Sequence, residues 1–113
     1  MKIEVDGKVV TVFVNSTDQW HGRPLYSAIV HVCQQHGIAG ATVSRCVEGY
    51  GAHRELHTTR LLELSEDLPV RIEIVDLPER IEPLLASLGT MIGEGLVVVS
   101  NVHIIRYLPD PAS

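Results

Sequence analysis

The spacing of apolar residues predicts strands in the first and the later part of the chain. Residues 9–14 read Val-Val-Thr-Val-Phe-Val, a β-branched and aromatic run typical of a strand near the centre of a sheet. Asp6-Gly7 is a candidate turn that would fold a short hairpin strand, residues 3–5, back onto it. In residues 70–75 polar and apolar positions alternate, which places Val70, Ile72 and Ile74 on one buried face.

Two further strands are predicted, at residues 40–47 and 96–107, the second with a break near Ser100-Asn101. Between the strands at 40–47 and 70–75, residues 52–67 contain leucines that follow no single period, so we expect a long mobile connection there.

Two helices are predicted from apolar residues spaced three and four apart. The first opens at Gly22-Arg23-Pro24 and has Gly37 as its C-cap. The second follows Asp76 and Glu79, which resemble a capping box, and Pro83 within its pattern predicts a kink or a regular helix that starts only near Arg80. The two apolar stripes are Leu25, Ala28, Ile29, Val32, Cys33 and Ile81, Leu84, Leu85, Leu88, Met91.

The order strand, helix, strand, strand, helix, strand predicts an α+β, ferredoxin-like fold. Two right-handed crossovers in this order give a four-stranded antiparallel sheet with both helices on one face. The first strand is apolar on both sides, so we expect another subunit to cover the other face.

Composition and charge narrow the classes of function. The 113 residues, 45% of them hydrophobic, suit one domain, with residues 108–113 as a flexible tail. A formal net charge of -5 with scattered arginines argues against nucleic acid, and no apolar run is long enough to insert in a membrane. We therefore expect a cytoplasmic protein, with Cys33 and Cys46 as buried free thiols.

The predicted winding brings three glycine-bearing connections to the same end of the sheet. They are residues 15–23, residues 49–67 and the turn at 93–95. Glycine permits unusual dihedral angles and close backbone approach, which a site gripping phosphate through main-chain N–H groups requires.

Several separated segments resemble a known family. The pattern of residues 37–43, 49–51 and 68–75 is similar to that of PII nitrogen-regulatory proteins. More closely, the chain resembles the PII-like family catalogued as domain of unknown function 190. The segments that carry this resemblance are Trp20-His21-Gly22-Arg23-Pro24-Leu25-Tyr26, residues 40–45, residues 64–70 and Ile105-Arg106-Tyr107.

This resemblance implies a trimeric signalling protein without catalytic activity. Such a protein binds an adenine nucleotide in clefts between subunits, and a loop after its second strand contacts a partner protein, which by analogy is a membrane transporter or channel. Carried onto this sequence, the nucleotide contacts fall on Gly40, Ala41, Thr42, Arg45, Gly49, Tyr50, Gly51, Glu73, Val75 and Arg106. No cofactor is required.

The sequence departs from the PII pattern in its charges. The turn Gly93-Glu94-Gly95-Leu96 lacks the lysine of classical PII proteins, and Tyr107 or Leu108 replaces a second arginine near Arg106. With two phosphate-binding charges missing, AMP or ADP is favoured over ATP. Val70 replaces the lysine that PII proteins use beside 2-oxoglutarate.

Other residues have competing interpretations. Trp20 can stack on a base or act as a hydrophobic staple on the first helix, and His21, Arg23 and Gly95 are further ligand candidates. Gly49-Tyr50-Gly51 can simply end a strand. Arg45 and Arg106 can be solvated, or paired with Glu73.

Two alternative functions come from histidines. His53 and His57 lie four residues apart, which suits a trimeric metal-binding module of the cation-tolerance type. An enzyme that hydrolyses a nucleotide in a cleft containing His21 and Arg23 is the other alternative, although the sequence shows no recognisable nucleophile with a general base.

Overall fold

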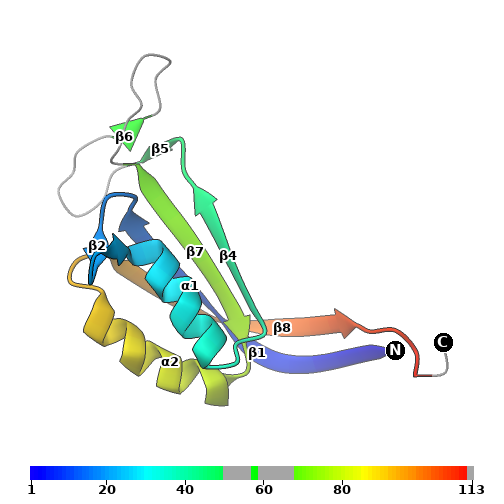
Figure 1. The fold of residues 1–113 in the computed structure, drawn as a ribbon. Helices are drawn as coiled ribbons and strands as arrows, with labels where there is room; N and C mark the ends of the chain where they lie inside the picture. Colours follow the sequence, from blue (N-terminus) through cyan, green and yellow to red (C-terminus); the bar gives the residue numbers. More distant parts are fainter. Residues whose placement is uncertain (50–56, 59–67, 112–113) are drawn as a thin grey trace.

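The computed structural model describes residues 1–49, 57–58 and 68–111. In these residues the main sheet has four antiparallel strands in the order β4-β7-β1-β8, and helices α1 and α2 lie on one of its faces (Figure 1). The predicted ferredoxin-like fold is confirmed. The elements are β1 (Lys2–Asn15), α1 (Leu25–Gln35), β4 (Gly40–Arg45), β7 (Pro69–Asp76), α2 (Pro78–Met91) and β8 (Leu96–Tyr107).

Short ladders complete the described structure. The first pairs β2 (Gln19–Trp20) with β3 (Arg23–Pro24), and the second pairs β5 (Glu48–Gly49) with β6 (His57–Thr58). The connection predicted at 52–67 otherwise lies outside the described residues.

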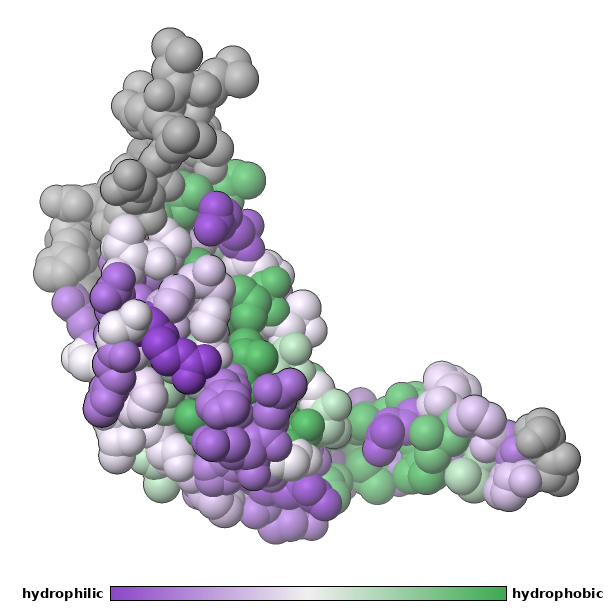
Figure 2. All heavy atoms as spheres, in the orientation of Figure 1, coloured by the Kyte–Doolittle hydropathy of each residue, from purple (hydrophilic) through white to green (hydrophobic). Residues whose placement is uncertain are grey.

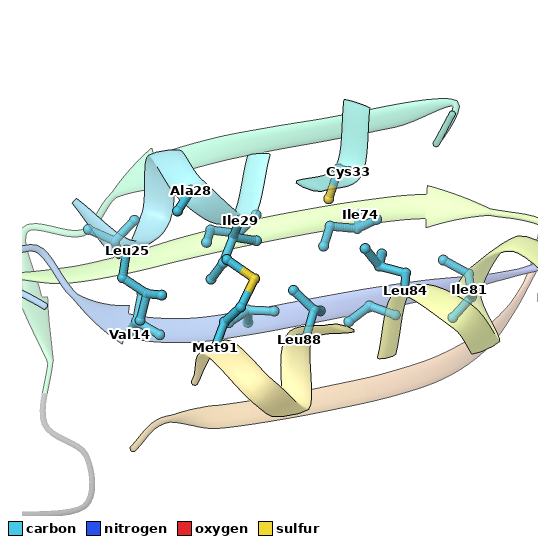
Figure 3. Close-up of a cluster of buried hydrophobic side chains, with 14 residues drawn as sticks. Val14, Leu25, Ala28, Ile29, Cys33, Ile74, Ile81, Leu84, Leu88 and Met91 are labelled. Carbon is cyan, nitrogen blue, oxygen red and sulfur yellow. The ribbon is translucent and has the colours of Figure 1, made fainter. Parts of the chain in front are cut away.

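The core fills the space between the helices and the sheet (Figure 3). Val70, Ile72 and Ile74 are buried as predicted, because every second residue of β7 faces the helices. On β1 the residues with the same orientation are Val10, Val12 and Val14. Both predicted helical stripes face this layer, and burying each large aliphatic side chain contributes about 1.5–3 kcal/mol.

Gly37 ends α1 as predicted. Its φ is 67°, in the left-handed region that favours glycine. The Gly37 N–H donates to the Gln34 carbonyl at 3.0 Å and the Ile38 N–H donates to the Cys33 carbonyl at 3.1 Å, the two bonds of a Schellman motif.

β1 is longer than predicted, and no turn forms at Asp6-Gly7. A Cβ at residue 7 would collide with the Ile104 side chain and lie 2.9 Å from the Asp76 carbonyl oxygen, so this glycine allows close packing within a continuous strand. β7 pairs with β1 only from Lys8 onward, whereas β8 pairs with β1 from Lys2 and shows no break at Ser100. Residues 2–7 and 102–107 thus form a projecting two-stranded arm (Figure 1).

The start of α2 also differs from the prediction. The helix begins at Pro78 rather than near Arg80, and it continues through Pro83. Pro83 removes the hydrogen bond to the carbonyl of Glu79, which is exposed in the first turn and can bind water. Ile81 and Leu84 are 0% exposed, and their burial holds the helix across this position.

Asp76 does not form a capping box, because Leu77 is the N-cap and makes no side-chain cap bond. The Asp76 side chain is instead buried at the end of β7. Its carboxylate accepts hydrogen bonds from the backbone N–H groups of Leu77 at 2.7 Å and Ala39 at 2.9 Å. One side chain therefore ties the connection between α1 and β4 to the start of α2.

We expect Asp76→Ala to lower the free energy of unfolding by about 1–3 kcal/mol, because two N–H donors lose their acceptor. Urea denaturation followed by circular dichroism measures this change. Glu79→Ala is the matched control, since exposed Glu79 should change stability by less than about 0.5 kcal/mol. Equal losses in both variants would restore the capping-box interpretation.

The sheet face opposite the helices is uncovered and largely apolar along β1 and β8. The registers place Val9, Thr11 and Phe13 of β1 on this face, together with Val98 and Leu96 of β8. Leu96 is 59% exposed and Val98 is 43% exposed. The prediction of an apolar second face is confirmed in the described residues.

Candidate functional site

Three connections leave the sheet at one end, as the winding predicted. Asn15 lies opposite Pro69, Phe13 opposite Leu96 and Arg45 opposite Val70. We call this the loop end, and we call the end where β4 begins and β7 finishes the arm end. Among the candidate residues, Gly49 follows the loop end in β5, whereas Tyr50 and Gly51 lie outside the described residues.

Gly95 lies at the loop end for a packing reason. A Cβ at this position would stand 2.9 Å from the Phe13 carbonyl oxygen and 3.2 Å from Val14 Cγ1. The glycine lets the turn before β8 approach β1 closely. The backbone of this turn consequently lies beside the end of the central strand.

Four candidate residues meet at the arm end. Gly40 lies opposite Val75 and Thr42 lies opposite Glu73, and both pairs lie on the sheet face away from the helices. Ala41 lies opposite Ile74 and packs against the core, so only its backbone is available to a ligand. We call Gly40, Thr42, Glu73 and Val75 the arm-end patch.

Glu73 accepts a hydrogen bond from Arg71, its neighbour on the same face of β7. This pair replaces the predicted alternative in which Arg45 or Arg106 binds Glu73. Both side chains are at least 40% exposed, so the pair contributes little to stability. Arg71 is a cation beside the patch that sequence reasoning missed, because alternation indicated only which side of the strand it occupies.

The structure separates the remaining candidates. Arg106 lies on the arm opposite Ile3, six positions along β1 from Val9, which faces Val75. At about 3.3 Å per residue this distance is roughly 20 Å. Arg45 is about 35 Å from Arg106, because its position on the ladder is level with Val14, eleven residues from Ile3. One chain therefore does not bring all the candidate residues together.

The segment around Trp20 forms a tight hairpin that sequence reasoning did not identify. Trp20 pairs with Arg23, and His21 and Gly22 between them have φ of 51° and 77°, as a type I′ turn requires. Trp20 packs against the core, consistent with the staple interpretation, and its ring centroid is 4.0 Å from that of His21. His21 and Arg23 are exposed.

The arm carries a charged cluster on the face opposite Arg106. His103 Nε2 is 3.1 Å from Glu4 Oε1, and His103 Nδ1 is 3.5 Å from Asp6 Oδ1. Hydrogen bonding to Glu4, and to a smaller extent to Asp6, raises the pKa of His103 above its ordinary value.

The Met1 ammonium group donates to the Leu108 carbonyl and to Asp110, each at 2.8 Å, so the first residues after β8 are tied to the start of β1.

The metal alternative has no support in the described residues, which contain no group of three or more side chains able to hold an ion. His53 and the side chain of His57 lie outside what the structure describes. Neither helix in the described part of the chain is long and apolar enough to cross a membrane.

Both cysteines are free, but their environments differ. Cys33 is buried in the core, and burial raises the pKa of its thiol to about 11. Cys46, expected to be buried, is only partly so.

We expect iodoacetamide at pH 8 to label Cys46 well before Cys33, because the thiolate is the nucleophile and Cys33 is held as a thiol. Mass spectrometry of digested protein over time gives the two rates. In a Cys46→Ser variant, labelling of the native protein should be nearly abolished and should return in urea. Fast labelling of Cys33 without denaturant would contradict its burial.

Solved structures share this fold. CPII, a nitrogen regulatory PII-like protein from Thiomonas intermedia K12 solved bound to ADP, AMP and bicarbonate, superposes with a TM-score of 0.69 at 17% identity, covering 90% of this chain and 91% of that one. The apo form of CPII gives a TM-score of 0.63 at 16% identity, covering 95% and 100%. The chain therefore has a PII-like fold.

Sequence comparison gives the family. The profile of DUF190, described as Uncharacterized ACR, matches residues 7–104, and the chain belongs to this family. A UPF0166 protein of Aquifex aeolicus is 31% identical over 101 residues, which cover 89% of this chain and 95% of the relative. A UPF0166 protein of Methanocaldococcus jannaschii is 31% identical over 103 residues, covering 90% and 94%.

Proposed function

We propose that this protein is a cytoplasmic PII-like regulator without catalytic activity, which binds an adenine nucleotide in clefts between the subunits of a homotrimer. Its membership of DUF190 and its fold, which it shares with the ADP- and AMP-bound CPII, support this proposal. The observation that carries it is the separation of the candidate residues into two groups at opposite ends of one sheet.

A site built from both groups requires two chains packed head to tail. The arm-end patch of one chain then faces Gly49-Tyr50-Gly51 and the turn at Gly95 of the next. Head-to-tail contacts close into a ring when the rotation permits, and a trimer is such a ring. The apolar face of β1 and β8 is the surface that this assembly would bury.

The two groups would supply different chemistry to a nucleotide. Thr42 and Glu73 offer a hydroxyl and a carboxylate to the base or ribose. The glycines at the loop end offer backbone N–H groups to phosphate. Because residues 93–96 contain no lysine, the site suits AMP or ADP better than ATP.

Occupancy of the nucleotide site would be signalled to a partner protein through the long connection after β4. A ligand shifts the population of a segment only if it binds one arrangement more tightly than the other. The partner we propose is a membrane transporter or channel, by analogy with PII proteins.

Calorimetry should detect binding of AMP or ADP, and light scattering should give a mass about three times 12.4 kDa. Thr42→Val removes one hydroxyl at constant shape, and we expect about two- to tenfold weaker binding. Thr90→Val is the control, because the Thr90 hydroxyl bonds to Ser87 on α2, on the helix side of the sheet. A monomer, or no binding of AMP, ADP, ATP or cyclic nucleotides at millimolar concentration, would remove the proposal.

Mixing subunits tests whether the site is shared. Glu73→Ala impairs the arm-end patch and Gly49→Asp places a negative charge at the loop end, so each homotrimer should bind nucleotide poorly. Trimers assembled from both variants contain some clefts with two unaltered halves, and calorimetry should show binding restored to a fraction of the clefts. A site contained within one chain would show no restoration.

A further inference from the structure

A groove runs between α1 and β4, on the side of the sheet that the helices cover. Its volume is about 390 Å³. Ser27, His31 and Gln34 of α1 line it at helical spacing. Arg23 of β3 and Val43 of β4 also line it. Figure 2 shows hydrophobic residues in green among hydrophilic ones in purple on this side of the molecule.

β4 is an edge strand, and within the described residues β7 is its sole partner in the sheet. The Cys46 N–H donates to the Pro69 carbonyl at 2.9 Å, so residues 46 and 69 are a hydrogen-bonded pair. Bonded pairs alternate in an antiparallel ladder, so Ser44 and Thr42 also bond to β7. Ala41, Val43 and Arg45 consequently direct their N–H and C=O groups toward the open edge.

The groove is basic although the chain is acidic overall. The formal net charge is -5, yet Arg23 and His31 line the groove and none of its lining side chains is a carboxylate. Tyr26 and Ser27 add hydroxyl groups, and Val30 with Val43 adds apolar surface. This lining matches an acidic side chain flanked by small apolar ones.

We propose that this groove binds an extended, acidic segment of another protein, which adds to β4 as a fifth strand. Backbone hydrogen bonds to Ala41 and Val43 would give affinity, and alternate side chains entering the groove toward Arg23 and His31 would give specificity. The opposite edge suits a different occupant, because β8 exposes the apolar run Leu96 to Val99, which fits a second copy of this chain. Binding of this segment in the groove does not depend on a bound nucleotide.

The first test uses the labelled peptide Val-Thr-Glu-Thr-Val-Ser, in which Val, Glu and Val share one face. Fluorescence anisotropy should show saturable binding that weakens at least tenfold when Glu is replaced by Gln. N-methylation along one edge of the peptide should abolish binding, and N-methylation along the other edge should not, because a strand pairs through one edge. Equal effects of both N-methylated peptides, or no binding, would overturn the proposal.

Variants of the protein locate the site. Arg23→Gln and His31→Gln should each weaken peptide binding several-fold, whereas Lys2→Gln removes a distant exposed cation and should not. Unchanged affinity in both groove variants would place the peptide elsewhere and overturn the proposal. His31 takes no part in the nucleotide proposal, so calorimetry should show unchanged ADP binding by His31→Gln, which keeps this result separate from the proposed nucleotide site.

Hydrogen exchange tests the edge itself. In the protein alone the amides of Ala41 and Val43 should exchange rapidly while those of Thr42 and Ser44 exchange slowly, and the peptide should slow Ala41 and Val43. Slow exchange of Ala41 and Val43 without peptide would mean that a second copy already covers the edge, and the proposal would fail.

Discussion

The pairing of β1 with two neighbours is the constraint on which the rest of the structure depends. β1 bonds to β7 from Lys8 to Asn15 and to β8 from Lys2 to Phe13. It therefore aligns β7 and β8 directly, and β4 through β7. Its pleat sends Val10, Val12 and Val14 toward the helices and Val9, Thr11 and Phe13 to the other face. A slip of one residue would exchange these faces and bury Thr11 in the core.

The length of this ladder determines how a site can be built. The connections collect at one end, the arm-end patch lies at the other, and Arg106 lies farther out on the arm, beyond the patch. A strand is stiff and extended, so residues separated along it stay separated. A site that needs both groups has to lie between two copies of the chain. The nucleotide proposal therefore depends on burial of the uncovered apolar face between copies.

The two edges of the sheet differ in the surface they offer. β8 shows valines and Leu96, whereas β4 shows the smaller side chains of Thr42, Val43 and Ser44 beside the basic groove. Apolar edges favour permanent burial, and edges with charged neighbours suit partners that bind transiently. The two proposals use this difference: the β8 edge would meet a second copy of the chain, and the β4 edge would stay open to another protein.

The local pattern of the sequence determined the elements, the two helical stripes, the alternation of β7 and the Gly37 cap, because these depend on side chains within one or two turns of each other. It also indicated the strand order and the end at which the loops gather. Tertiary contacts decided the rest. Gly7 serves close packing against Ile104 and Asp76 rather than a turn, Asp76 binds Ala39 across the fold rather than capping α2, and Arg71 rather than a distant arginine reaches Glu73. The first two contacts join residues remote in sequence, and in the third the remote arginines lie elsewhere in the sheet, which leaves Glu73 to its neighbour Arg71. These distances are set only when the sheet and helices pack.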